Sequence, residues 1–279
     1  MPSFSFQQVD VFASAPLKGN PLAVVIGADG LSDAAMAAFA NWTNLSETTF
    51  LLKPTQAGAD YRVRIFTPER ELPFAGHPTL GSCQVWLNAG NAPKGSHVVQ
   101  ECAAGLIRIK RDADRLAFAA PPLRRSGDVE EATLQRIAKG LRIERGAIKA
   151  SQWCDNGPGW TGIMLESRAA VLALRPDHAA LADLKPGVVG PWDAKTDGND
   201  AQFELRAFVP SRSTEDPVTG SLNAGVAQWL IGAGLAPSSY VASQGTVLGR
   251  AGRVHVERDG EDVWIGGRTV TCVDGRVTL

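Results

Sequence analysis

The feature that most constrains the fold of this 279-residue sequence is a segment that occurs twice. Residues 75–90 align with residues 219–234 at an offset of 144, with glycines, a glutamine and an Ala-Gly pair at matching places. Just upstream, Arg64-Ile-Phe-Thr-Pro68 resembles Arg206-Ala-Phe-Val-Pro210. A solenoid repeats roughly every 20–50 residues and at least three times, so a period of half the chain predicts two similar domains instead.

Hydrophobic periodicity predicts both strands and helices along the chain. One surface helix is expected at residues 32–41 behind a serine N-cap, and another at residues 129–139. The second has Asp128 and Glu131 as a capping-box analogue and Gly140 just past its end. The predicted strands are residues 5–12, 61–66, 106–110, 115–118, 203–208, 253–257, 263–265 and 268–273.

A Pro-led stretch at residues 121–127 separates a predicted strand from a predicted helix and marks the domain boundary. The sequence thus predicts an N-terminal domain of residues 1–121 and a C-terminal domain of residues 122–279, and leaves open whether the last strand crosses back. Each half is mostly sheet around one buried apolar helix, with further helices outside. This is an α+β fold in two lobes.

Charge and cysteine usage exclude several classes of partner. The chain has 28 Lys and Arg against 29 Asp and Glu, so it lacks the positive field that nucleic acid or an anionic membrane requires. Its four cysteines are far apart, which disfavours a disulfide framework and a zinc site. The uncharged stretch 217–249 contains an apolar run only over residues 224–235, short of the roughly 20 residues of a membrane span. No secretory signal is visible, and we expect a cytoplasmic protein without a bound metal.

Each copy of the repeat brings a glycine, Gly76 or Gly220, to the first turn of an apolar helix. The first N–H groups of a helix have no partner within the helix and carry partial positive charge. Glycine allows a ligand to approach the backbone closely. Two such helix starts predict a binding site for an anion, with a carboxylate as the expected group. The alternative is ordinary capping by Thr79 or Ser221 without a ligand.

Three polar residues cluster at these helix starts: His77 follows Gly76, Asp216 precedes Gly220 by four residues, and Ser221 follows Gly220. A fourth candidate, Glu47, leads into an apolar, strand-like run. A carboxyl group in an apolar cleft holds a proton more readily, which suits proton transfer near neutral pH. Glu47 could instead be a surface turn residue, and the sequence alone favours that alternative.

The motifs Asn44-Leu-Ser-Glu-Thr-Thr-Phe50, Phe74-Ala-Gly-His-Pro-Thr79 and Asp216-Pro-Val-Thr-Gly-Ser221 together closely resemble the PhzF-like isomerases. That phenazine-biosynthesis-like family belongs to the diaminopimelate epimerase and proline racemase superfamily, and the resemblance covers essentially the whole chain. It implies two pseudosymmetric lobes, each a curled, mostly antiparallel sheet around a central buried helix. It also implies an active site in the cleft between the lobes, and a homodimer.

The resemblance assigns a role to each candidate residue. Glu47 is expected to shuttle a proton, while the remaining candidates bind the substrate. The expected substrate-binding residues are Gly76, His77, Asp216, Thr219, Gly220 and Ser221.

One departure from the superfamily constrains the chemistry. The epimerases and racemases place a cysteine just before the glycine that opens each core helix, and this sequence has Ala75 and Thr219 there. A two-thiol mechanism therefore has no residues to use. The expected reaction is a cofactor-independent isomerisation of a small carboxylate, in which one glutamate removes a proton from carbon and returns it elsewhere on the same face.

Three alternatives compete with this interpretation. Ser221, His77 and Asp216 could form a hydrolase triad, although the segment lacks the G-x-S-x-G elbow. Residues 157–162 match G-x-G-x-x-G, but a strand-like segment follows, so a turn between strands is expected rather than a dinucleotide site. The chain could also be a small-carboxylate binding protein that keeps the fold and has lost the reaction.

Overall fold

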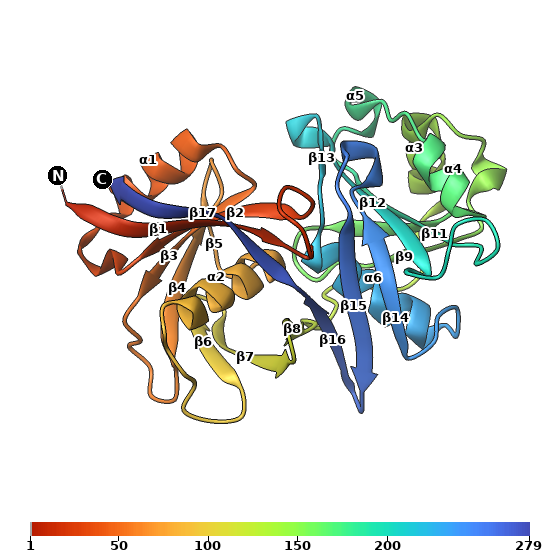
Figure 1. Ribbon diagram of the computed structural model, residues 1–279. Coiled ribbons are helices and arrows are strands. Elements are labelled where there is room, and N and C mark those ends of the chain that lie inside the picture. The colour runs from red at the N-terminus through yellow and green to blue at the C-terminus, as the bar shows by residue number, and fades with distance from the viewer. Residues whose placement is uncertain (1) are drawn as a thin grey trace. The chain divides into compact units, whose positions relative to one another are not determined.

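The computed structural model describes residues 2–279, which form two compact units (Figure 1). Unit 1 comprises the chain up to Ala119 together with Gly266–Leu279, and unit 2 comprises Ala120–Ile265. The C-terminal strand β17 (Thr269–Thr278) belongs to unit 1, where it pairs antiparallel with β1 (Ser3–Val11). Unit 1 is therefore built from both ends of the chain, whereas unit 2 is continuous.

The sheet of unit 1 has the strand order β17, β1, β2, β3, β4, β6, β7, β8, with the short β5 beside the end of β4. The pairs β2–β3 and β4–β6 are parallel, and the other pairs are antiparallel. The remaining strands are β2 (Asn20–Ile26), β3 (Glu47–Leu52), β4 (Tyr61–Phe66), β5 (Glu71–Leu72), β6 (Val98–Cys102), β7 (Gly105–Asp112) and β8 (Arg115–Ala119).

Unit 2 repeats this topology. Its strands follow the order β9, β10, β11, β12, β14, β15, with β13 beside β12. The pairs β10–β11 and β12–β14 are parallel, like β2–β3 and β4–β6 in unit 1. The strands are β9 (Ala150–Trp153), β10 (Trp160–Met164), β11 (Lys185–Pro191), β12 (Phe203–Val209), β13 (Thr214–Asp216), β14 (Ser239–Gln244), β15 (Gly252–Asp259) and β16 (Asp262–Gly267).

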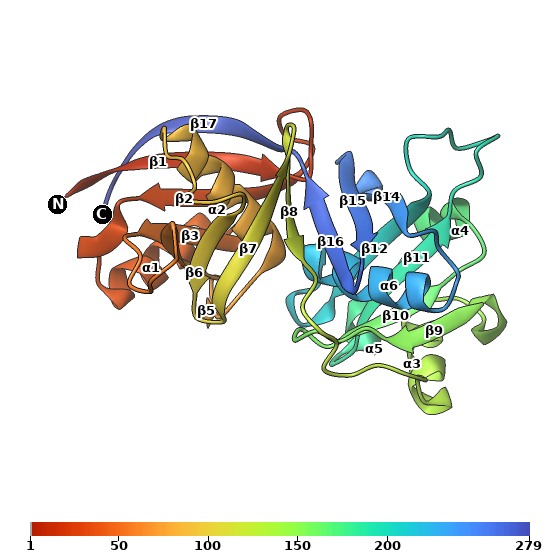
Figure 2. The same ribbon diagram turned by 90° about the horizontal axis from the view of Figure 1, so that it is seen from below.

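Each unit contains one central helix of thirteen residues, α2 (Gly76–Asn88) in unit 1 and α6 (Gly220–Gly232) in unit 2. The α2 helix packs against β1, β2, β3 and β8, and α6 packs against β10 and β15 (Figure 2). The repeated segment thus marks the same element in two copies of one architecture. The predicted α+β fold, with a mostly antiparallel sheet around a buried helix in each half, is confirmed.

The glycines shared by the two copies let each central helix lie close to its sheet. A Cβ atom on Gly81 would lie 2.5 Å from Cδ2 of Leu22, and one on Gly225 would lie 2.4 Å from the carbonyl oxygen of Cys154. Any larger residue at either position would push the helix away from its sheet.

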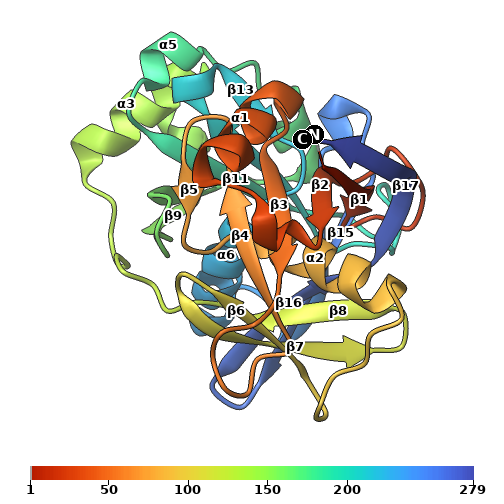
Figure 3. The same ribbon diagram turned by 90° about the vertical axis from the view of Figure 1, so that its left-hand side faces the viewer.

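The other helices lie outside the central ones. The predicted N-cap of α1 is confirmed, because the Ser32 side chain accepts a hydrogen bond from the Ala35 N–H at 3.2 Å. This helix packs against β3 and β4 (Figure 3). The outer helices are α1 (Asp33–Thr43), α3 (Glu131–Leu141), α4 (Arg168–Ala173) and α5 (His178–Leu181). Among residues 2–279, no helix is both long and apolar enough to cross a membrane.

The predicted termini of α3 were wrong at both ends. The helix begins after Glu130 without a side-chain cap, since Glu131 instead accepts hydrogen bonds from Arg145. Gly140 lies inside the helix rather than beyond its end. A Cβ atom there would lie 2.4 Å from Cδ2 of Leu181, so this glycine provides close packing with α5 instead of ending α3.

Candidate functional site

The start of β3 is held by hydroxyl contacts on both sides, and this fixes the backbone of Glu47, its first residue. Thr48 contacts the hydroxyl of Thr43 at the end of α1 (2.8 Å), and Thr49 accepts a hydrogen bond from Ser82 of α2 (2.9 Å). All of these hydroxyl groups come from unit 1. They attach β3 to both helices beside it, so the carboxylate of Glu47 extends from a well-anchored strand end.

Glu47 lies beside His77, the second residue of α2. Oε2 of Glu47 is 3.3 Å from Nε2 of His77, and the two side chains are only 16% and 6% exposed. Nε2 forms no aligned hydrogen bond with any described residue, so this contact is a close approach of the two groups. The structure therefore brings together two of the predicted site residues that are thirty positions apart in the sequence.

The surroundings of His77 set its charge and its tautomer. Burial lowers the pKa of His77 to about 3, so the imidazole is neutral at neutral pH. Nδ1 of the ring is 3.4 Å from Nδ2 of Asn20, the first residue of β2. An amide nitrogen can only donate, so Nδ1 accepts and the ring proton lies on Nε2, which faces Glu47. The imidazole thus presents a neutral donor beside the carboxylate.

The N-terminus of α2 is left open for a ligand. Its N-cap, Ala75, offers no side-chain cap. Thr79 does not cap the helix either, because its N–H and its hydroxyl both donate to the carbonyl of Ala75 (3.1 and 2.9 Å). Pro78 has no N–H, and the N–H groups of Gly76 and His77 have no partner among the described residues. These two N–H groups lie at the helix start where the sequence predicts an anion to bind, and that prediction stays a prediction.

The N-terminus of α6 in unit 2 is similar. Its N-cap, Thr219, does not use its hydroxyl to cap the helix and donates instead to Oδ2 of Asp216 at 2.5 Å. Ser221 accepts a hydrogen bond from the indole N–H of Trp160 at 2.9 Å. The N–H groups of Gly220 and Ser221 have no partner among the described residues. Capping by Thr79 or Ser221 therefore explains neither helix start, and the four predicted site residues of this unit lie together.

The contacts of Ser221 do not support a hydrolase. A nucleophilic serine needs a base that accepts its proton, but an indole N–H can only donate. The Asp216 carboxylate bonds to Thr219. Ser221 thus has the environment of a binding residue.

The N-cap residues of the two central helices are Ala75 and Thr219, so neither helix start carries a thiol there. The nearest thiol in unit 1, Cys83, lies further along α2 in the core, and burial raises its pKa to about 12. Burial likewise raises the pKa of Cys154 to about 12. Neither thiol can act as a thiolate base near neutral pH.

The first residues of the glycine-rich segment 157–162 form a turn between β9 and β10, as expected. Oδ1 of Asp155 accepts hydrogen bonds from the N–H groups of Gly157 and Gly159, both at 2.7 Å. The strand β10 begins within the segment, at Trp160, and no helix start is available there for a dinucleotide.

Sequence reasoning missed the side chains that hold the candidate residues in place. Asn20 holds His77, and Trp160 holds Ser221. Gln244 contacts both Asp216 and Thr219. Asn20 and Gln244 lie in segments that also resemble the family, and that resemblance was the only available signal. Nothing in the local pattern around Trp160 marked it as part of a site.

Comparisons with known proteins identify the family of this chain. Residues 9–275 match the family described as "Phenazine biosynthesis-like protein". The chain is 36% identical to Antisense-enhancing sequence 1 of Schizosaccharomyces pombe, with 99% of each protein covered. It is 33% identical to the trans-2,3-dihydro-3-hydroxyanthranilate isomerase of Pseudomonas aeruginosa, with 97% of this chain and 98% of that protein covered.

Solved structures give the same result. A PhzF-family protein of Enterococcus faecalis superposes with a TM-score of 0.83 at 27% identity over the full length of both chains. A hydroxyproline epimerase of Agrobacterium vitis, at 14% identity, shares the fold with a TM-score of 0.57 over 99% of this chain and 92% of that one. The protein therefore belongs to the PhzF, or phenazine biosynthesis-like, family of isomerases.

Proposed function

We propose that this isomerase moves a proton between two carbon atoms of a small carboxylate substrate without a cofactor, and that Glu47 is its acid and base. The observation that supports this most strongly is the pairing of Glu47 with His77. The imidazole is neutral, so Glu47 is the proposed proton-transfer group of this pair.

The chemistry requires few steps. The Glu47 carboxylate removes a proton from a carbon that an adjacent double bond or carbonyl makes acidic. The electron pair left behind delocalises through that unsaturation. The protonated Glu47 then returns the proton to the far end of the delocalised system on the same face. Substrate and product have the same composition, and the glutamate ends as it began.

The helix starts are proposed to bind the substrate. The N–H groups of Gly76 and His77, and those of Gly220 and Ser221, suit a carboxylate. Asp216 suits a hydrogen-bond donor or a cationic amine. A carboxylate suits either helix start, and an amino or hydroxyl group suits Asp216.

The relative from Pseudomonas aeruginosa suggests the first compound to test. Its name identifies trans-2,3-dihydro-3-hydroxyanthranilate, which carries a carboxylate, an amino group, a hydroxyl group and ring unsaturation. Each of these groups has a counterpart in the proposed site. We therefore propose this compound, or a close analogue, as a substrate.

The test follows isomerisation by proton NMR in D2O. Wild-type protein should convert the compound, and deuterium should appear at carbon to the extent that the proton on Glu47 exchanges with solvent before it is returned. Glu47→Gln should lower the rate at least about a hundredfold while binding survives, because loss of a general acid/base typically costs 10²–10⁴-fold. The matched control is Glu166→Gln, which makes the same change at a largely exposed side chain of unit 2. Binding with neither conversion nor deuterium uptake by the wild type would instead indicate a protein that has lost the reaction.

A further inference from the structure

Gln244, the last residue of β14, is fully buried, and its side-chain amide makes four hydrogen bonds. Oε1 accepts from the Thr219 N–H (3.0 Å) and from Nδ2 of Asn223 (2.9 Å). Nε2 donates to the carbonyl oxygen of Asp216 (3.0 Å) and to the hydroxyl of Thr219 (2.9 Å). Two of the partners are backbone groups, an N–H and a C=O, so the amide has only one satisfactory orientation.

This orientation determines the direction of the next hydrogen bond. The Thr219 hydroxyl accepts a hydrogen bond from Nε2 of Gln244. Its own O–H therefore donates to Oδ2 of Asp216, 2.5 Å away. Oδ2 of Asp216 is thereby held as a hydrogen-bond acceptor. The chain of bonds from Gln244 through Thr219 to Asp216 lies entirely within unit 2.

The equivalent amide in unit 1 is turned the other way. Gln100 of β6 occupies the position that corresponds to Gln244 at the repeat offset of 144, and Thr79 corresponds to Asn223. Nε2 of Gln100 donates to the Thr79 hydroxyl (3.0 Å), and its Oε1 accepts from the Tyr61 hydroxyl (2.9 Å). Both amides attach a sheet strand to the first turn of the central helix. Only the one in unit 2 presents its N–H groups toward a carboxylate-bearing loop.

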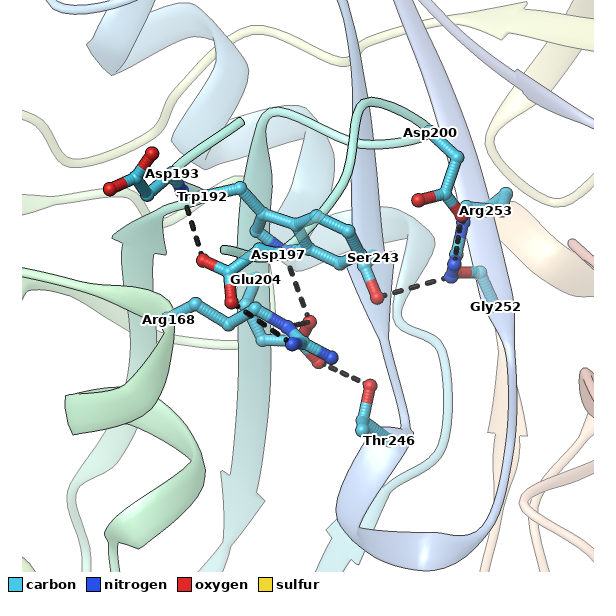
Figure 4. Close-up of polar contacts among 10 residues, drawn as sticks. All are labelled: Arg168, Trp192, Asp193, Asp197, Asp200, Glu204, Ser243, Thr246, Gly252 and Arg253. Atoms are coloured by element: carbon cyan, nitrogen blue, oxygen red, sulfur yellow. Dashed lines mark hydrogen bonds and ion pairs between the residues drawn. The ribbon is translucent and has the colours of Figure 1, made fainter. Parts of the chain in front are cut away.

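The chain just after Gln244 is also fixed. Thr246 donates to Oε1 of the fully buried Glu204 at 2.6 Å, and the same carboxylate accepts from Arg168 and Trp192 (Figure 4). Just before Gln244, Ser243 accepts from Arg253 at 3.1 Å. These contacts restrain Gln244 from both sides, so its amide can impose an orientation on Thr219 instead of adapting to it.

We propose that Gln244 is a positioning residue for substrate recognition: it orients the Thr219 hydroxyl toward Asp216 and so keeps Asp216 ready to accept hydrogen bonds from amino or hydroxyl groups of the substrate. This assignment rests on the proposed function, because it takes Asp216 as a substrate-binding residue. It adds a requirement that the three family motifs do not contain, namely an amide at position 244.

The test measures binding by titration calorimetry with two ligands that cannot isomerise. One is 3-hydroxyanthranilate, which has a carboxylate, an amino group and a hydroxyl group; the other is benzoate, which has the carboxylate alone. Gln244→Glu keeps the shape of the side chain but removes the two donated hydrogen bonds. Thr219→Val removes the hydroxyl and leaves Gln244 intact, and Thr219→Ser restores the hydroxyl.

We expect Gln244→Glu and Thr219→Val each to weaken 3-hydroxyanthranilate binding about tenfold, the usual effect of losing one hydrogen bond to a charged group. Benzoate binding should change less than about twofold, since that ligand offers Asp216 no donor. Thr219→Ser should recover most of the 3-hydroxyanthranilate affinity that Thr219→Val loses, because it restores the hydroxyl group. The double variant should bind no more weakly than Thr219→Val alone, because both changes break one chain of bonds.

Two results would overturn the assignment while the proposed function stands. One is an equal loss of affinity for both ligands, which a purely structural role predicts. The other is unchanged 3-hydroxyanthranilate binding in folded Gln244→Glu. If Gln244→Glu does not fold, the Thr219→Val and Thr219→Ser pair still decides between these outcomes. A wild-type protein that binds neither ligand would contradict the proposed function itself, and the assignment with it.

Discussion

His77 is the residue whose charge state most strongly limits the chemistry of unit 1. A protonated imidazole 3.3 Å from Glu47 would form an ion pair with it and compete with the substrate for the carboxylate. Burial instead keeps the ring neutral, with a pKa of about 3. The proposed function therefore assigns the proton transfer to Glu47 and only hydrogen bonding to His77.

The buried, neutral state of His77 predicts a pH dependence of stability. Between pH 6.5 and pH 3 the unfolded chain binds a proton at this residue and the folded chain does not, so stability is complete above pH 6.5 and falls as the pH is lowered. Lowering the pH from 6.5 to 5 should reduce the free energy of unfolding by about 2 kcal/mol. His77→Asn should remove this loss.

The measurement is urea denaturation of the wild type and of His77→Asn at pH 7 and pH 5. The difference in unfolding free energy between the two pH values should be smaller in the variant by about that amount. An identical difference in both proteins would show that His77 is not neutral in the folded state over this range.

At the scale of elements, the close packing of the central helices gives a second prediction. Gly225→Ala should destabilise the protein by about 2 kcal/mol, the usual cost of overpacking, because the new methyl group meets the backbone oxygen of Cys154. Gly232→Ala is the matched control in the same helix. Nothing lies within 4 Å of its Cβ position, so alanine should be neutral or stabilising by up to about 1 kcal/mol.

Thermal denaturation followed by circular dichroism compares these two variants with the wild type. Equal stability of both would mean that α6 has room to move away from its sheet. That result would contradict the explanation that close packing requires the glycine shared by the two copies of the repeat.

The sequence predicted the elements that have strong local patterns. The starts of α2 and α6 at Gly76 and Gly220 followed from the repeat, and the strand at Tyr61–Phe66 followed from its alternating pattern. In contrast, β11 (Lys185–Pro191) was missed, since its two prolines and two glycines argue against a strand. The structure explains one of these glycines: a Cβ atom on Gly187 would lie 2.1 Å from Cδ1 of Leu222 in α6.

The candidate site was predictable only in part, because its contacts join elements that are far apart in the sequence. The motifs identified Glu47, His77 and Asp216 as candidate residues, but not the contacts that their side chains make. The pairing of Glu47 with His77 depends on how β3 packs against α2, which local sequence does not encode. The role of Gln244 depends on the orientation of one amide between two backbone groups, and only coordinates can provide that.

At the scale of the whole molecule, the return of the C-terminal strand to unit 1 gives a third prediction. Nine residues of β1 pair with β17, so a chain truncated after Arg268 leaves that edge of the sheet open. Unit 2 is continuous and has its own apolar core. The proposed division into two domains therefore predicts that truncation lowers the melting temperature of unit 1 by about 10 °C or more and leaves the unit 2 transition in place.

Differential scanning calorimetry of the full-length and truncated chains distinguishes the outcomes. Two separate transitions after truncation, with the upper one unchanged, would agree with two domains. A single transition that shifts as a whole would show that the units unfold together, and would contradict the domain proposal.

The most direct test of the central claim, that one carboxylate both removes and returns the proton, is the stereochemistry of deuterium in the product formed in D2O. The substrate for this test has a single hydrogen on the carbon that loses it, so the face of departure is known. Glu47 acting alone predicts that deuterium arrives at the new carbon on that same face. Arrival on the opposite face would require a second acid group and would contradict the account.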